Sequence, residues 1–156
     1  MTVRSLFTRE RMASPPTGGA RTVLVDGGTL TLDEVVAVAR DHAPVRLSDE
    51  VEVRQSMRAS VALNRDLIAR GIPLYGVTTG FGDSLHRQVS PAAAGALQQH
   101  LIRFLGTGTG PTTPLETARA VVLLRANNLA RGHSAVRVEL VERLLDLLNR
   151  DVVPVI

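Results

Sequence analysis

Apolar residues recur every three or four positions through most of this chain, which is the pattern of amphipathic helices. The pattern predicts five helices, over residues 31–42, 48–70, 90–105, 113–132 and 137–149. The residues expected to face inward from them are Leu32, Val35, Val36, Ala39, Val53, Met57, Val61, Asn64, Ile68, Leu97, Leu101, Phe104, Leu105, Ala118, Val121, Val122, Leu129, Leu140, Leu144, Leu145 and Leu148. We therefore expect a mainly α fold, resembling part of a helical bundle.

Capping signals place the helix ends. The stretches TLDE (31–34) and TPLE (113–116) both fit a capping box, and the second also has a proline for the first helical position. Ser48 and Ser90 are the expected caps of two further helices. Glycines at 71 and 132 are expected to end the helices that precede them.

Three segments depart from the helical pattern. TVLV (22–25) followed by DGG predicts a short strand and a turn, and DVVPVI (151–156) predicts an extended apolar segment. Residues 1–21 are polar and contain SPPTGG, so we expect a flexible lead-in before a domain over 22–156. An uncovered segment such as 151–156 would expose apolar surface, so we expect further protein to continue or cover it.

Composition narrows the function. The chain is 44% hydrophobic and has no cysteine, which fits a globular protein and excludes disulfides, thiolate zinc sites and cysteine nucleophiles. We see no membrane-span pattern and no signal-peptide pattern, so we expect a cytoplasmic chain. All 18 basic residues are arginines, but they are interleaved with 15 acidic residues, and aromatic residues make up only 3%. That balance disfavours nucleic-acid binding.

The stretch LYGVTTGFGDSLHRQVSP (74–91) holds three glycines within seven residues and follows directly on a predicted helix. Glycines let a backbone approach a ligand closely and let a loop close over it. Tyr75 opens this loop and is a candidate for proton transfer, because nearby positive charge would make its phenol a usable acid or base. A purely structural tyrosine is the alternative.

Two other features suggest cofactors only at first sight. GTGTG (106–110) follows a helix and lacks the GxGxxG spacing, so we interpret it as a turn between helices. The histidines at 42, 86, 100 and 133 do not share a helix face at ligand spacing, so we expect no metal site. His86, inside the glycine loop, either contacts a ligand or lies on the surface.

Four motifs together resemble a known family. YGVTTGFG (75–82), LIRFLGTGTG (101–110), RANNLARGHSAVR (125–137) and NRDVVPVI (149–156) follow the order and spacing of the aromatic amino-acid ammonia-lyases and the related 2,3-aminomutases. The resemblance covers about residues 22–156 and is strongest to phenylalanine ammonia-lyase types. It implies the N-terminal helical domain of that fumarase/aspartase-like superfamily, incomplete without the central helical bundle.

The resemblance also implies roles for individual residues. Tyr75 matches a catalytic acid–base residue on a mobile inner loop, which exchanges a proton with the substrate's β-carbon or its departing group. Gly76, Thr78, Thr79, Gly80 and Phe81 belong to that lid loop, and Gly82, His86, Phe104 and Leu105 match substrate-binding positions. The family's electrophile is 4-methylidene-imidazol-5-one (MIO), which forms from an Ala-Ser-Gly tripeptide and makes ammonia a viable leaving group.

Phe104 and Leu105 also bear on the substrate. In the family, a histidine at the first position accompanies tyrosine as substrate, and a histidine at the second accompanies histidine. Both positions are apolar here, so a buried phenol or imidazole would lose a partner at a cost of about 1–3 kcal/mol. This implies a phenylalanine-like substrate, while the alternative is that both residues simply pack in a core.

The chain departs from the family at the cofactor, because no Ala-Ser-Gly occurs in its 156 residues. Three hypotheses follow: one subunit of a split lyase or aminomutase, an N-terminal fragment of a longer chain, or a non-catalytic binding or regulatory module. We favour the first, with a second polypeptide supplying MIO and the central helices in a hetero-oligomeric or tetrameric assembly. The intact Tyr75, Gly80 and Gly82 argue against the third.

Overall fold

The computed structural model describes residues 7–8 and 21–156, so most of the lead-in predicted for 1–21 lies outside the described residues. The chain forms two compact units. The first combines the described residues up to 61 with 112–156, and the second comprises 62–111. The boundary between them falls within one long helix, α2 (Val51–Ala69).

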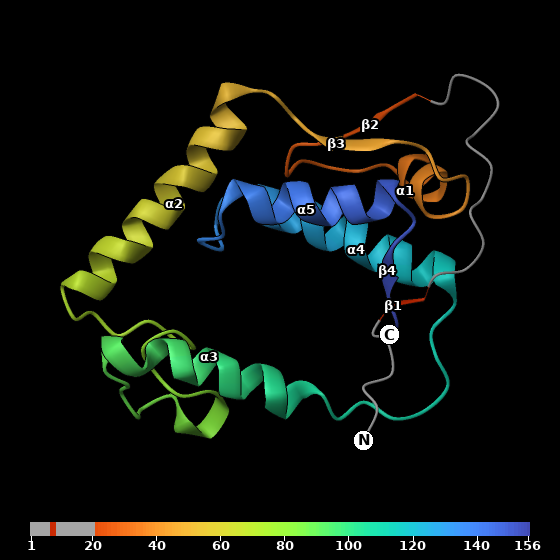
Figure 1. Cartoon of the computed structure of the whole chain (residues 1–156). Coiled ribbons are helices and arrows are strands. Elements are labelled where there is room, and N and C mark those ends of the chain that lie inside the picture. The colour runs from red at the N-terminus through yellow and green to blue at the C-terminus, as the bar shows by residue number, and fades with distance from the viewer. Residues whose placement is uncertain (1–6, 9–20) are drawn as a thin grey trace. The chain divides into compact units, whose positions relative to one another are not determined.

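The first unit is built on a parallel strand pair and three further helices (Figure 1). Its strands are β2 (Val23–Val25) and β3 (Val45–Leu47), and its helices are α1 (Leu32–Ala39), α4 (Leu115–Ala130) and α5 (Val138–Asn149). Val23 pairs with Val45 and Val25 with Leu47, and α1 forms the crossover that a parallel pair requires. A second small sheet joins β1 (Phe7–Thr8) antiparallel to β4 (Val153–Pro154).

The core of this unit lies between the strand pair and the helices. Alternate strand residues are buried, and α5 contacts both β3 and α4 (Figure 1). The residues that form the core are Val23, Val25, Val38, Ala43, Val45, Leu47, Met57, Ala118, Val122, Leu123, Ala126, Leu129, Ala130, Val138, Val141, Leu145, Leu148 and Val153. Burial of this apolar surface is the main stabilising contribution to the fold.

Arg119 of α4 is only 1% exposed and joins the ends of two helices. Its guanidinium donates to the carbonyl oxygens of Val38 (2.9 Å) and Leu148 (3.2 Å), in the last turns of α1 and α5, and to Asp151 Oδ1 (2.7 Å). Burial lowers the pKa of Arg119, and the Asp151 carboxylate opposes that shift. The arginine therefore supplies donors to carbonyls in the last turns of two helices, and the Leu148 carbonyl also accepts from the Asp151 N–H.

The second unit holds the end of α2, a short 3₁₀ turn η1 (Gly82–Ser84) and α3 (Pro91–Leu105). Gly71 follows α2 with φ +70°, and the N–H of Ile72 donates to the Leu67 carbonyl, which confirms the predicted stop. Residues 74–89 between Gly71 and α3 form the glycine loop.

The five predicted helices are confirmed, with shifted ends. The capping box at Thr31 and Glu34 is present, but the first helix stops at Ala39 rather than residue 42. The capping box predicted at TPLE (113–116) is wrong: Pro114 takes the N-cap position and α4 begins at Leu115, with no side-chain cap bond. The sequence pattern also missed β3, whose Val45, Arg46 and Leu47 form a strand by pairing with residues 23–25.

The serine caps differ from prediction in their bonds. Ser90 is the N-cap of α3, but its side chain makes no cap hydrogen bond. Ser48 precedes α2 by three residues, and its hydroxyl accepts from the N–H of Glu50.

Some residues predicted to face inward are exposed, namely Leu32, Val121, Leu140, Phe104 and Leu105. The prediction followed apolar residues alone. The buried side of α4 instead includes two polar residues, Arg119 and Asn127, whose polar groups have partners inside the fold. That choice of face leaves Val121 on the outside.

Candidate functional site

Tyr75 lies at the start of the glycine loop and is 67% exposed. Its hydroxyl oxygen accepts a hydrogen bond from the backbone N–H of Gly82 at 3.2 Å. The ring of Phe81 meets the Tyr75 ring edge to face, with centroids 6.5 Å apart and planes at 83°. The tyrosine is thus accessible to a ligand, although its ring and hydroxyl both have partners inside the loop.

Two buried threonines support the turn that carries Tyr75. Thr78 Oγ1 accepts from the N–H of Leu74 at 2.9 Å, and Thr79 Oγ1 accepts from the N–H of Gly76 at 3.2 Å. The Thr79 hydroxyl in turn donates to the Gly80 carbonyl at 3.1 Å. Both threonine side chains therefore hydrogen-bond to the loop backbone and stabilise its conformation.

The rest of the loop is a short hairpin. Thr79 pairs with Gln88 in an antiparallel bridge, and the Val89 N–H donates to the Thr78 carbonyl at 2.8 Å. The Gly80 N–H donates to the Arg87 carbonyl at 3.0 Å. The turn η1 forms the tip, and His86 lies exposed beyond it.

The loop glycines are required for different reasons. Gly76 and Gly82 have φ of +71° and +54°, a region that side chains disfavour. A Cβ on Gly80 would lie 2.5 Å from the Ser84 carbonyl oxygen, so this position has no room for a side chain. In this structure, the glycines that we expect to let the loop close over a ligand form a defined turn.

One contact that the sequence reasoning missed comes from α3. The Gln98 Nε2 donates to the Gly76 carbonyl oxygen at 2.6 Å. Gln98 lies on the half-buried side of α3 with Ala94, Leu97 and Leu101. The available signal was a polar residue within an otherwise apolar stripe, which indicates a hydrogen bond to satisfy.

Phe104 and Leu105 lie at the end of α3 and are 75% and 65% exposed. They are therefore not core residues of an inward helix face. Leu105 follows Gln98 by seven residues, so the two share one side of the helix about 10 Å apart along its axis. The structure brings Tyr75, Phe81 and Gly82 together and places Phe104 and Leu105 on the helix that holds their loop.

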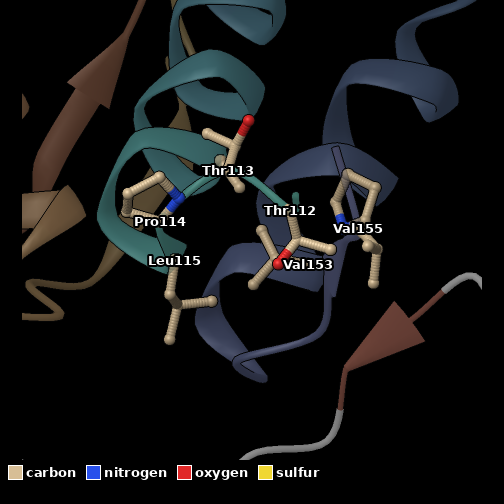
Figure 2. A pocket seen from close by; sticks show the side chains of 8 residues that line it. Thr112, Thr113, Pro114, Leu115, Val153 and Val155 are labelled. Carbon is tan, nitrogen blue, oxygen red and sulfur yellow. The ribbon is translucent and has the colours of Figure 1, made fainter. Parts of the chain in front are cut away.

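A separate pocket lies in the first unit, beside β4 (Figure 2). It has a volume of about 260 Å³ and is lined by Thr112, Thr113, Pro114, Leu115, Ala118, Val153, Pro154 and Val155. Its lining offers threonine hydroxyls and apolar carbons but no titratable group, so it carries no acid–base chemistry. It lies where the chain enters α4, and the Thr113 N–H donates to the Ile156 carbonyl there.

Two further properties of the described residues concern metal binding and membrane insertion. Within 7–8 and 21–156, no group of three or more histidine, aspartate or glutamate side chains is placed to hold a metal ion. No helix in that part of the chain is long and apolar enough to cross a membrane.

Comparison with known proteins gives consistent matches. The family description "Aromatic amino acid lyase" matches residues 30–156. The chain is 43% identical over 136 residues to a histidine ammonia-lyase of Chloroflexus aurantiacus and 44% identical over 134 residues to one of Myxococcus xanthus, covering 86% of this chain and 26% of each relative. The tyrosine aminomutase structure from Streptomyces globisporus matches with a TM-score of 0.78 at 39% identity, covering 84% of this chain and 24% of that one.

These matches define a mainly helical domain of the kind found in ammonia-lyases and aminomutases. The chain belongs to the aromatic amino acid lyase family. It spans about a quarter of the length of the curated relatives it matches (26%).

Proposed function

We propose that residues 22–156 form the N-terminal part of an ammonia-lyase that eliminates ammonia from an aromatic L-amino acid to give an arylacrylate. The observation that carries this proposal is Tyr75, an exposed phenol on a loop built from glycines. Among residues 7–8 and 21–156, its hydroxyl has one hydrogen-bond partner, the Gly82 N–H, and that N–H donates to the phenol oxygen. The O–H itself is therefore left to face a ligand.

The reaction needs two kinds of help. The β C–H bond of an amino acid is barely acidic, and an amine leaves poorly without activation. In the elimination, a base removes the β proton, the C–H electrons form the Cα–Cβ double bond, and ammonia departs with the C–N electrons. Tyr75 exchanges the proton at the β-carbon or at the departing group, and its loop fixes where the phenol oxygen stands.

MIO, when bound, supplies the electrophile that activates the amine. The chain's own residues do not form it, because the 156 residues contain no Ala-Ser-Gly. We propose that other residues of the protein, in a longer chain or in a second polypeptide, provide this group and the central helices. The assembly would be a tetramer or a hetero-oligomer.

Phe104 and Leu105 favour a phenylalanine-like substrate. Both present apolar surface at the end of α3, where an imidazole or phenol would find no side-chain hydrogen-bond partner from these two residues. A histidine substrate is the second candidate, favoured by the 43–44% identity to histidine ammonia-lyases. The match to a tyrosine aminomutase keeps 2,3-amino migration as the alternative reaction.

The decisive experiment is Tyr75→Phe in the complete assembled protein. Turnover of phenylalanine should fall by about 10²–10⁴-fold, the usual contribution of a general acid or base. Assembly, followed by native mass spectrometry, should not change. Chromatography of the products separates the arylacrylate of a lyase from the β-amino acid of an aminomutase, and histidine and tyrosine are assayed in parallel. Near-normal turnover by the variant would exclude Tyr75 as the acid–base residue.

A non-catalytic module that keeps the fold is the remaining alternative. It predicts no turnover of any aromatic amino acid by the wild-type assembly. It also predicts an intact mass equal to that of the encoded chains, whereas MIO formation removes two waters from the chain that carries it.

A further inference from the structure

Gln98 lies outside the glycine loop, and its side chain binds the turn at Tyr75. Its Nε2 donates to the Gly76 carbonyl oxygen at 2.6 Å, from a position 22 residues further along the chain. A carbonyl oxygen only accepts, so the side-chain NH₂ must face it, and the orientation of the amide is fixed by chemistry.

The bond acts next to Tyr75, at a glycine with positive φ. Gly76 directly follows Tyr75 and has φ +71°. Glycine has no intrinsic preference for this conformation over others, so its flanking peptides turn easily unless something holds them. Thr79 holds the N–H of Gly76 and Gln98 holds its carbonyl.

The threonine bonds and the Gln98 bond constrain different parts of the structure. Thr78 and Thr79 belong to the loop, so their bonds shape it without placing it relative to a helix. Gln98 belongs to α3, and the same side of that helix reaches Leu105 two turns further on. A bond from Gln98 to Gly76 therefore relates the Tyr75 backbone to the helix that ends in Phe104 and Leu105.

We propose that Gln98 is a positioning residue for Tyr75, which sets the phenol's place relative to the aromatic-binding end of α3. This rests on the proposed function of Tyr75 and deepens it. Gln98 acts through the Gly76 carbonyl and does not itself contact the substrate. Loss of its donor should shift the phenol oxygen and slow the proton transfer more than it weakens substrate binding.

The test compares Gln98→Glu with Gln99→Glu in the complete assembled protein. The two substitutions are chemically identical on adjacent positions of α3, but Gln99 is exposed. The carboxylate introduced at position 98 cannot donate and repels the Gly76 carbonyl. We expect kcat to fall by about ten- to a hundred-fold with a smaller change in KM, because small misplacements of reacting groups cost that much. Gln99→Glu should leave both constants unchanged.

Hydrogen exchange gives a readout independent of activity. Amides of residues 75–82, including the Gly82 N–H bound to the Tyr75 hydroxyl, should exchange faster in Gln98→Glu than in Gln99→Glu. A third variant, Gln98→Lys, retains a donor at the end of a flexible side chain and should recover most of the lost kcat and protection. Failure of this rescue would contradict the positioning role.

Each other outcome has a defined meaning. Equal kcat and equal exchange in Gln98→Glu and Gln99→Glu would overturn the inference. So would a fall in kcat that merely follows lost assembly or a lowered unfolding temperature. An active Gln98→Glu beside an inactive Tyr75→Phe would overturn this inference alone, whereas an active Tyr75→Phe would overturn the proposed function.

Discussion

Asn127 on α4 accepts a hydrogen bond from the backbone N–H of Gly27, 100 residues earlier, through its Oδ1 at 3.0 Å. Its Nδ2 donates to the neighbouring Gly28 carbonyl at 2.8 Å. One side-chain amide therefore binds both the Gly27 N–H and the Gly28 carbonyl of the turn after β2. A Cβ on Gly27 would lie 2.7 Å from the Arg131 backbone nitrogen, which shows how closely the turn approaches α4. This pair fixes the strand–turn segment onto the helix.

Replacing Asn127 by Asp should therefore destabilise the fold. A carboxylate still accepts from Gly27, but it has no N–H for the Gly28 carbonyl and repels it. We expect a loss of about 1–3 kcal/mol in the free energy of unfolding, the cost of a buried group left without its partner. Urea unfolding measures it, and Asn128→Asp, the same change at an exposed neighbour, is the control. Equal stability of the two variants would contradict the role of Asn127.

Arg119 gives a second stability prediction. Arg119→Met keeps the apolar stem but removes the donors to Val38, Leu148 and Asp151. We expect a loss of about 1–3 kcal/mol, because the two carbonyl oxygens and the partly exposed Asp151 carboxylate lose their donors. Arg125→Met, on an exposed side of the same helix, should change stability by about 0.5 kcal/mol or less. A similar small change at both positions would show that the buried guanidinium adds no net stability.

The hydrogen bonds of Glu34 predict that the stability of the fold depends on pH. Hydrogen bonds from the backbone N–H and the hydroxyl of Thr31 lower the pKa of Glu34 from its ordinary value of 4.5. A carboxyl with a lowered folded-state pKa stabilises the fold above its unfolded pKa, and this contribution disappears as pH falls through the folded value. Glu34→Gln should thus be less stable than wild type at neutral pH.

The difference between Glu34→Gln and wild type should shrink once the pH drops below the folded pKa of Glu34, because the wild-type carboxyl is then also neutral. Unfolding curves at several pH values measure this, and NMR titration of Glu34 reports its pKa directly. Asp33→Asn, in the same first turn, is a control. A stability gap that stays constant with pH would contradict the assignment.

Substrate choice can be tested at the end of α3. Leu105→His should raise kcat/KM for histidine relative to phenylalanine, and Phe104→His should do so for tyrosine, because each supplies a partner for the polar ring. A gain of about 1–3 kcal/mol corresponds to roughly five- to 150-fold in the ratio. Ile102→His, equally exposed on the same helix, is the control and should leave the ratios unchanged. Unchanged ratios in all three variants would exclude 104 and 105 as ring-recognition positions.

The parts of the fold that the sequence predicted correctly are governed by nearby residues. The capping box of Thr31 and Glu34 acts within one turn, and Gly71 acts on the helix that it ends. The sequence pattern missed β3 because Val45 to Leu47 becomes a strand only by pairing with residues 23–25. Arg119 and Asn127 are not among the residues predicted to face inward, because the partners that bury them lie far away in the sequence.

In the candidate site, too, features set by local sequence could be predicted and features set by distant contacts could not. The glycine loop and Tyr75 could be singled out from local composition, and the structure gives each glycine a backbone reason. Gln98 stood out only as a polar residue within an apolar stripe of its helix, and the sequence gives no sign of which group its amide binds. Phe104 and Leu105 were placed on the correct helix, but their exposure depends on what surrounds α3 and not on its periodicity.

The sequence separations of these bonds also set an order of folding during synthesis. The bonds that shape the Tyr75 loop join residues at most 22 positions apart, whereas the bonds of Asn127, Arg119 and Asn149 to residues 28, 38 and 45 span 81 to 104 positions. Closing a long loop costs entropy before any contact stabilises it. On the ribosome, the segment that carries the phenol can therefore fold while α4 and α5 are still being made, whereas the strand pair, although its own pairing spans only 22 positions, lacks the contacts of those two helices until they emerge. An arrest of translation after α3 would yield a chain in which the loop is protected from exchange and residues 21–61 are not.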